Sequence, residues 1–116
     1  MARRSETDLL AASFQGRWRI AEMELWDNDA LDLVELAFIE ISGQEGEMRF
    51  IAVRAWRDIR YTSQGSGPRA EFSWEGVDEG DQRSGRGWLE TGMAGRLVGH
   101  FYFHMGDDSE LVCEPW

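Results

Sequence analysis

Two histidines, His100 and His104, are the residues whose type and spacing first suggest metal chemistry. A neutral imidazole is a common metal ligand. Four residues along an extended strand separate the two rings by about 13 Å, which is too far to share one ion unless the strand bends sharply. The histidines also alternate with Phe101 and Phe103, which places them on the outer face of that strand. We therefore expect surface histidines; a pair at an oligomer interface is the second interpretation, and a metal ligand the third.

Three acidic turns, at residues 27–29, 78–81 and 106–108, could attract calcium. Loops of the EF-hand type need a longer series of oxygen ligands with a central glycine and a terminal glutamate. None of the three turns has that pattern. We expect them to be solvated turns, and we predict neither a metal nor a cofactor.

The nucleophiles and acids of the sequence form no recognisable catalytic motif. Cys113 is the single cysteine and lies in an apolar stretch, where a thiol is usually buried. There is no Gly-x-Ser-x-Gly elbow, and Glu22 and Glu24 share one face of a strand without further support. The glycine-rich stretch 76–87 precedes no helix that would complete a phosphate loop. No catalytic residue is predicted, and an enzyme is the least favoured of the functions considered.

Composition limits the partners and the compartment. The 116 residues include 22 acidic and 12 basic side chains, so the net charge is −10, and a field of that sign repels nucleic-acid phosphates. A single cysteine excludes an internal disulfide. No stretch approaches the roughly 20 apolar residues of a membrane helix, and the N-terminal apolar run is too short for a signal peptide. We expect a cytoplasmic protein that binds neither nucleic acid nor membrane, with an N-terminal arm at 1–13 and one domain at 14–116.

Alternating apolar and polar residues predict an all-β chain of roughly eight strands. A capping box over residues 5–8 opens a short helix that ends by about Ser13. The links between strands are too short for crossover helices, so neighbouring strands should be antiparallel and form a meander. Eight such strands can close into a small barrel, which removes exposed sheet edges; a sandwich is the alternative. The expected strands are 16–26, 37–42, 47–56, 58–62, 69–75, 84–91, 96–105 and 109–116.

Two of these strands have unusual patterns. In 16–26 the apolar residues change parity midway, which predicts a bulge near Ala21 that keeps Glu22 and Glu24 outside. In 47–56 both faces are largely apolar, and a single barrel can bury only one of them. Covering the other face with a second copy of the chain predicts a homodimer.

A ligand site is expected where large rings face the barrel interior. The cleanest alternation places Ala70, Phe72 and Trp74 inside, and a later strand adds Phe101 and Phe103. Rings of this size can fill a small barrel completely or leave room for one aromatic or short acyl ligand. An open cavity above about 300 Å³ would favour the ligand, and a solid core would favour a self-associating module.

Four further residues complete the predicted site. Trp88 stands between two glycines that leave space beside it, Trp18 should be a buried anchor beside the N-terminal helix, and Tyr61 could fix a polar end of the ligand. Arg54 leaves two interpretations open. On an interior face its guanidinium needs a carboxylate, such as Glu22, or an anionic ligand head group, whereas on an exterior face it is solvated. The predicted ligand-binding residues are Trp18, Arg54, Tyr61, Phe72, Trp74, Trp88, Phe101 and Phe103.

Gly16 and Trp18 form a Gly-x-Trp step at the start of the first expected strand. With the short helix before it and the meander after it, this step resembles the calycin group of lipocalin-type and avidin-type barrels, which implies the same barrel fold. The stretches 23–26, 71–76 and 85–88 are also similar to a group of small uncharacterised bacterial proteins, a resemblance that implies no activity. The favoured function is non-catalytic binding of a small apolar or aromatic ligand inside the barrel. A self-associating structural or protein-interaction module is the alternative.

Overall fold

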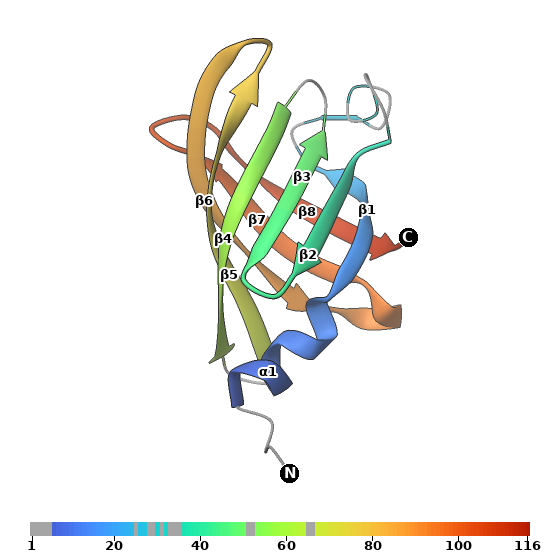
Figure 1. Ribbon diagram of the computed structural model, residues 1–116. Coiled ribbons are helices and arrows are strands. Elements are labelled where there is room, and N and C mark those ends of the chain that lie inside the picture. The colour runs from blue at the N-terminus through green and yellow to red at the C-terminus, as the bar shows by residue number, and fades with distance from the viewer. Residues whose placement is uncertain are drawn as a thin grey trace.

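Eight antiparallel strands follow one another around a closed barrel in the computed structural model (Figure 1). The structure describes residues 6–24, 26–27, 30, 32, 36–50, 53–64 and 67–116. Each strand pairs with its neighbours in the sequence, and β1 pairs with β8 to close the barrel. This confirms the predicted all-β meander barrel. The strands are β1 (Gly16–Met23), β2 (Phe38–Ser42), β3 (Glu45–Phe50), β4 (Val53–Gln64), β5 (Gly67–Asp78), β6 (Asp81–Thr91), β7 (Leu97–Phe103) and β8 (Asp108–Pro115).

A short helical segment precedes the barrel, as predicted. The helix α1 (Glu6–Ala11) continues into a 3-10 turn (Ala12–Phe14) and lies against β4 and β5. A helix this short is marginal alone, so the surface on which it packs stabilises it. The fully buried ring of Phe14 lies 5.9 Å from the ring of Tyr61. The segment thus closes one end of the barrel (Figure 1). Within the described residues, no helix is long and apolar enough to span a membrane.

The β5–β6 hairpin extends beyond the rest of the barrel at the opposite end (Figure 1). Its turn consists of Glu79 and Gly80, which both have positive φ, at 51° and 88°. Such two-residue turns match the right-handed twist of the flanking strands, and glycine adopts the second position without steric cost. The acidic stretch 78–81 is therefore a tight turn with its side chains toward solvent.

The predicted bulge in β1 is confirmed. The pairing of β1 with β8 shifts register between Ile20 and Glu22, so Ala21 is the extra residue. Because of this shift, Ile20 and Met23 are both buried, although an odd number of positions separates them. Glu22 and Glu24 both stay exposed to solvent, as predicted.

The prediction of one strand over 47–56 is wrong, and so is that of a separate short strand over 58–62. The chain reverses between Phe50, the end of β3, and Val53, the start of β4. Each of the two strands therefore has a single apolar face. The apolar residues change parity at this point because the chain reverses, and not because one strand is buried on both faces. The premise of the homodimer prediction is removed, and the oligomeric state stays a prediction. Ile51 and Ala52 lie outside the described residues.

Glycines stand next to large side chains in the rows that cross the inner face of the sheet. One row runs through Gly46, Arg57, Trp74, Gly85 and Phe103. A methyl group on Gly46 would lie 2.6 Å from NH2 of Arg57, and one on Gly85 would lie 2.8 Å from Nε1 of Trp74. The two glycines therefore leave the space that the arginine and tryptophan side chains occupy.

The neighbouring row repeats this arrangement. Phe72 pairs with Gly87, and a methyl group on that glycine would lie 2.4 Å from Cζ of the Phe72 ring. The space that the sequence analysis predicted beside these glycines is therefore present, and aromatic rings occupy it. The rings come from β5, however, and not from Trp88 between the glycines.

Candidate functional site

The described interior contains one buried guanidinium, that of Arg57 on β4. Arg57 is 5% exposed, and NH2 of its guanidinium donates to the carbonyl oxygen of Glu40 at 3.3 Å. Nε and NH1 are buried and have no hydrogen-bond partner. Sequence reasoning missed this residue, although Arg57 shares its parity with Val53, Ala55 and Ile59, which are all buried. The signal becomes readable only once the chain reversal before Val53 is known.

Residues from several strands surround the Arg57 side chain. The guanidinium carbon lies 4.9 Å from the centre of the Phe72 ring, and Gly46 of β3 lies directly beneath NH2. Burial lowers the pKa of Arg57 to about 10, an effect that the neighbouring Cys113 and Tyr61 partly offset. The group therefore remains a cation near neutral pH.

Cys113 and Tyr61 are the neighbours of Arg57 that can ionise. Burial raises the pKa of Cys113 to about 12, and the cationic Arg57 opposes this shift only weakly. Burial likewise raises the pKa of Tyr61, against a hydrogen bond from Gln15 and the charge of Arg57. Both groups are consequently neutral where the arginine is charged, so neither provides it with a counter-ion.

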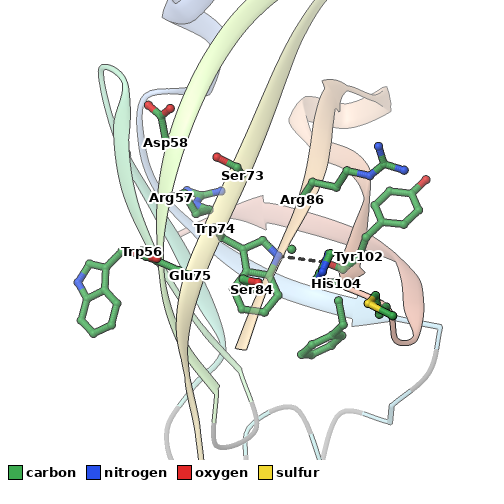
Figure 2. Close-up of a pocket in the computed structure, with 13 residues that line it drawn as sticks. Trp56, Arg57, Asp58, Ser73, Trp74, Glu75, Ser84, Arg86, Tyr102 and His104 are labelled. Carbon is green, nitrogen blue, oxygen red and sulfur yellow. Dashed lines mark hydrogen bonds between the residues drawn. The ribbon is translucent and has the colours of Figure 1, made fainter. Parts of the chain in front are cut away.

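An aromatic cluster occupies the barrel on the side away from α1. The ring of Trp74 stacks on Phe101 at 4.7 Å and meets Phe103 edge-on at 5.3 Å. Trp26 continues the cluster, with its ring 5.6 Å from Phe50 and 6.3 Å from Phe103. The indole N–H of Trp74 donates to the Tyr102 carbonyl oxygen at 3.1 Å, which orients this ring (Figure 2). The cluster ends in two half-buried rings, those of Trp26 and Phe103.

Two adjoining hollows border this cluster. One of about 800 Å³ spans β4 to β7 (Figure 2), and although Arg57, Trp74 and Phe103 line it, most of its other lining residues are exposed on the outer face of the sheet, among them Trp56, Ser73, Glu75, Ser84 and Arg86. The other, of about 850 Å³, lies at the open end and is lined by Trp26, Phe103 and the β5–β6 hairpin. Both exceed the roughly 300 Å³ of a small-molecule site, but both open to solvent instead of being enclosed by the barrel.

Six of the eight predicted site residues, all except Arg54 and Trp88, lie in the core or pack against it. Phe72, Trp74 and Phe101 are buried there, and Phe103 is half-buried at the open end. Tyr61 lies at the closed end, where its hydroxyl donates to the carbonyl oxygen of Gly43. These residues do not form one site, because Tyr61 belongs to the helical closure and the four rings belong to the interior beyond it.

Trp18 lies beside the helical closure and packs against the core, but it is half-buried, so the expectation of a buried anchor is correct only in part. Its indole N–H donates to the carbonyl oxygen of Phe14 at 2.9 Å. Trp18 therefore anchors the N-terminal segment through this hydrogen bond and through its packing against the core.

Two predicted site residues lie on the outer face. Trp88 is half-buried under the guanidinium of Arg69, 4.2 Å from its ring, because Gly87 and Leu89 are the inward positions of β6. Arg54 is also outside, where its Nε lies 3.4 Å from Glu47 and its guanidinium carbon 5.0 Å from the Trp56 ring centre. Placing Trp88 in the interior was wrong, and for Arg54 the solvated interpretation is correct.

The histidines also face outward. The ring of His100 hydrogen-bonds with Asp108 and packs on Tyr102 at 4.6 Å, and His104 is exposed in the turn that follows β7. In the part of the chain that the structure describes, no three or more His, Cys, Asp or Glu side chains gather closely enough to hold a metal ion.

The sequence matches no protein-family model and no curated protein, and no solved structure matches. The closed eight-stranded meander is consistent with a calycin-like barrel in its architecture.

Proposed function

We propose that this protein is a non-catalytic binding protein whose barrel holds a small apolar or aromatic ligand. The observation that carries the proposal is the aromatic cluster, which reaches the open end of the barrel, where two of its rings are half-buried. Trp26 and Phe103 are half-buried and border the hollow of about 850 Å³. A ligand with an aromatic or acyl body would extend the cluster and gain about 25 cal/mol for each Å² of apolar surface removed from water.

The ionisable groups of the described interior favour binding over catalysis. The pKa of Arg57 is about 10 and that of Cys113 about 12, and the pKa of Tyr61 is raised from 10.0. All three groups keep their protons near neutral pH. A general base needs a pKa close to the working pH, so these groups can donate hydrogen bonds to a ligand but cannot take a proton from it.

The architecture supports the same proposal. A short helix followed by an eight-stranded antiparallel barrel is the arrangement of calycin-type barrels, and barrels of this size can hold one small ligand. Since one fold serves many functions, the rings at the open end and not the fold carry the proposal.

The test uses N-phenyl-1-naphthylamine, an uncharged aromatic dye that fluoresces more strongly in apolar surroundings. We expect saturable binding by the wild-type protein and about five- to tenfold weaker binding by Trp26→Ala, which loses one ring of the site. Trp88→Ala is the matched control, because it removes a ring from the outer face. It should bind the dye as the wild type does.

Circular dichroism establishes that each variant is folded. A folded wild-type protein that binds no dye up to the solubility limit would overturn the proposal. Weaker binding by Trp88→Ala, with Trp26→Ala unchanged, would instead place the dye on the outer surface and also contradict an interior site.

A further inference from the structure

We infer that the free edge of β6, at the tip of the β5–β6 hairpin, is a self-association surface whose partner is the same edge of a second copy of this chain. The two β6 strands would pair antiparallel about a two-fold axis at Gln82. Asp81 of each copy would then lie opposite Arg83 of the other. The inference does not rest on the proposed ligand binding, and it uses neither of the apolar faces from which the sequence predicted a dimer.

The first argument is that β6 has an uncovered edge. Strand β7 pairs with β6 only from Gly85 onward, whereas β6 begins at Asp81. The hairpin extends beyond the rest of the barrel at this point (Figure 1). The hollow of about 850 Å³ runs along the same edge, where Gln82 and Arg83 of β6 line it together with Met105 in the turn after β7. An open edge of this kind is a template for pairing with another strand.

The backbone groups at this edge point away from the hairpin. Asp78 and Asp81 close a two-residue turn, and the closing pair of such a turn exchanges backbone hydrogen bonds. The alternation of the ladder therefore directs the N–H and C=O of Gln82 away from β5. The carbonyl oxygen of Ser84 has the same direction, and it accepts from the amide of His104 at 2.7 Å. A second strand could thus continue the sheet at Gln82.

The second argument is the charge pattern along the edge. Arg83 is exposed, and among the described arginines it alone has neither a carboxylate within 4.0 Å nor an aromatic ring beneath its guanidinium. Asp81 lies two positions earlier on the same face and is also exposed, with no ion pair to a described residue. Antiparallel pairing about Gln82 brings the two opposite charges together twice. Cross-strand pairs of opposite charge stabilise a sheet.

The pairing is complete with two copies. Each copy supplies the same edge, so the interface is isologous and a filament does not follow. At the axis, Gln82 of each copy would exchange both backbone hydrogen bonds with its counterpart. Because the strands run in opposite directions, the two barrels would lie at opposite ends of the joined hairpins. Each turn would then lie near Met105 of the other copy, which is 94% exposed. The contact is short, so the dimer should be weak, with a Kd on the order of tens of micromolar.

The experiment is sedimentation equilibrium of the wild-type protein from about 5 to about 500 µM, which brackets the expected Kd. Salt at about 150 mM, where the Debye length is about 8 Å, screens the repulsion between two copies of net charge −10. We expect a monomer–dimer equilibrium. Arg83→Glu and Asp81→Arg each place like charges opposite one another, so each variant alone should associate at least about tenfold more weakly. Arg96→Glu, an equal change of charge between β6 and β7, should associate as the wild type does.

An equimolar mixture of Arg83→Glu and Asp81→Arg tests the register. Each variant then meets the opposite charge at both positions, so the mixture should recover dimers of about wild-type affinity. A wild-type protein that stays monomeric throughout the concentration range would overturn the inference and show that the two charges protect the edge from pairing. A dimer that neither substitution weakens, or a mixture that does not associate, would exclude this edge as the interface.

The wild-type protein decides the matter if a variant does not fold. Hydrogen exchange at the amide of Gln82 should slow several-fold between the lowest and the highest concentration, because dimerisation gives this N–H an acceptor. Exchange that does not depend on concentration would overturn the inference. None of these measurements uses a ligand, so dye binding tests the proposed function separately.

Discussion

The two ends of the barrel differ in the contacts that their side chains make. At the helical end, Phe14 is fully buried and Gln15 makes three hydrogen bonds. Its side-chain oxygen accepts from the amide of Gly43 at 2.7 Å, and its side-chain nitrogen donates to Tyr61 Oη and to the carbonyl oxygen of Ala11, each at 3.0 Å. At the other end, Trp26 and Phe103 meet through ring contacts and remain half-buried.

For the proposed ligand binding, this difference indicates which end of the barrel would admit the ligand. Hydrogen bonds are directional, so a ligand that separated Gln15 from its partners would leave polar groups without equivalent replacements. Ring contacts are much less specific, and an aromatic ligand can replace one protein ring as a neighbour at small cost. We therefore regard the helical end as a structural closure and the end at Trp26 as the entrance.

The largest effect is expected for Phe14→Ala. This ring is completely buried at the helical end, so its removal should lower the free energy of unfolding by about 3–5 kcal/mol. Phe103→Ala, the matched change at the entrance, should cost less than half as much, because its ring is already partly exposed. Urea denaturation measures both values. Equal losses would show that the two ends are equally closed.

Trp18→Ala should have the second largest effect. The substitution removes a half-buried ring together with the hydrogen bond to the carbonyl oxygen of Phe14, and we expect a loss of about 2 kcal/mol. Trp88→Ala is the control for losing a half-buried indole that lies on the outer face. A loss for Trp18→Ala that is no greater than that of the control would show that Trp18 does not anchor the helical end.

Gln15→Ala should cost about 1 kcal/mol, since its hydrogen bonds are exposed to solvent. The local effect should be clearer than the global one. The amide of Gly43 loses its acceptor, and its hydrogen exchange should accelerate while amides in the centre of β4 are unaffected. Unchanged exchange at Gly43 would contradict the assigned role of Gln15 in closing this end.

The smallest expected effect is a pH dependence of the free energy of unfolding that arises from the buried Cys113. Burial raises the pKa of Cys113 from 9.0 to about 12, so above pH 9 the unfolded thiol loses its proton while the folded thiol keeps it. The unfolded state then binds fewer protons, and the free energy of unfolding should fall with rising pH by up to about 1 kcal/mol per unit.

Arg57 and Tyr61 begin to contribute between pH 9 and 10, so the comparison with Cys113→Ala separates the effect of the thiol from theirs. Above pH 10 the buried Arg57 acts in the opposite direction, because its lowered pKa makes the folded protein release that proton first. Urea denaturation at the two pH values should show a decrease for the wild-type protein and a flatter profile for Cys113→Ala. The same decrease in both proteins would exclude the thiol as its cause.

The strand patterns of the sequence predicted the fold well, but they did not predict the buried Arg57. The change of parity in β1 correctly indicated a bulge at Ala21, because the flanking strand is long enough to establish both phases. The same kind of change at residues 50–53 is a chain reversal, and no glycine or proline marks it in the sequence. Because the sequence prediction placed no turn here, it merged β3 with part of β4. As a result, it did not show that Arg57 faces inward.

The position of Trp88 shows a second limit of local patterns. In β6 the inward positions include Gly85 and Gly87, which have no side chains to mark the buried face. The large residue between them therefore looked like an interior residue. The rings that occupy this space belong to Phe72 and Trp74 on the neighbouring strand, and only strand pairing brings them over the glycines.

The sequence by itself determined that this chain forms an eight-stranded meander with a short helix at its start. Alternation and turn residues are local properties, and they predict strands wherever the pattern is long enough. Only the tertiary structure decided that Arg57 is buried with no carboxylate partner among the described residues, that Phe14 closes one end and that rings reach the other. These features depend on which residues face one another across the closed barrel, because burial and charge pairing arise from contacts between strands distant in the sequence.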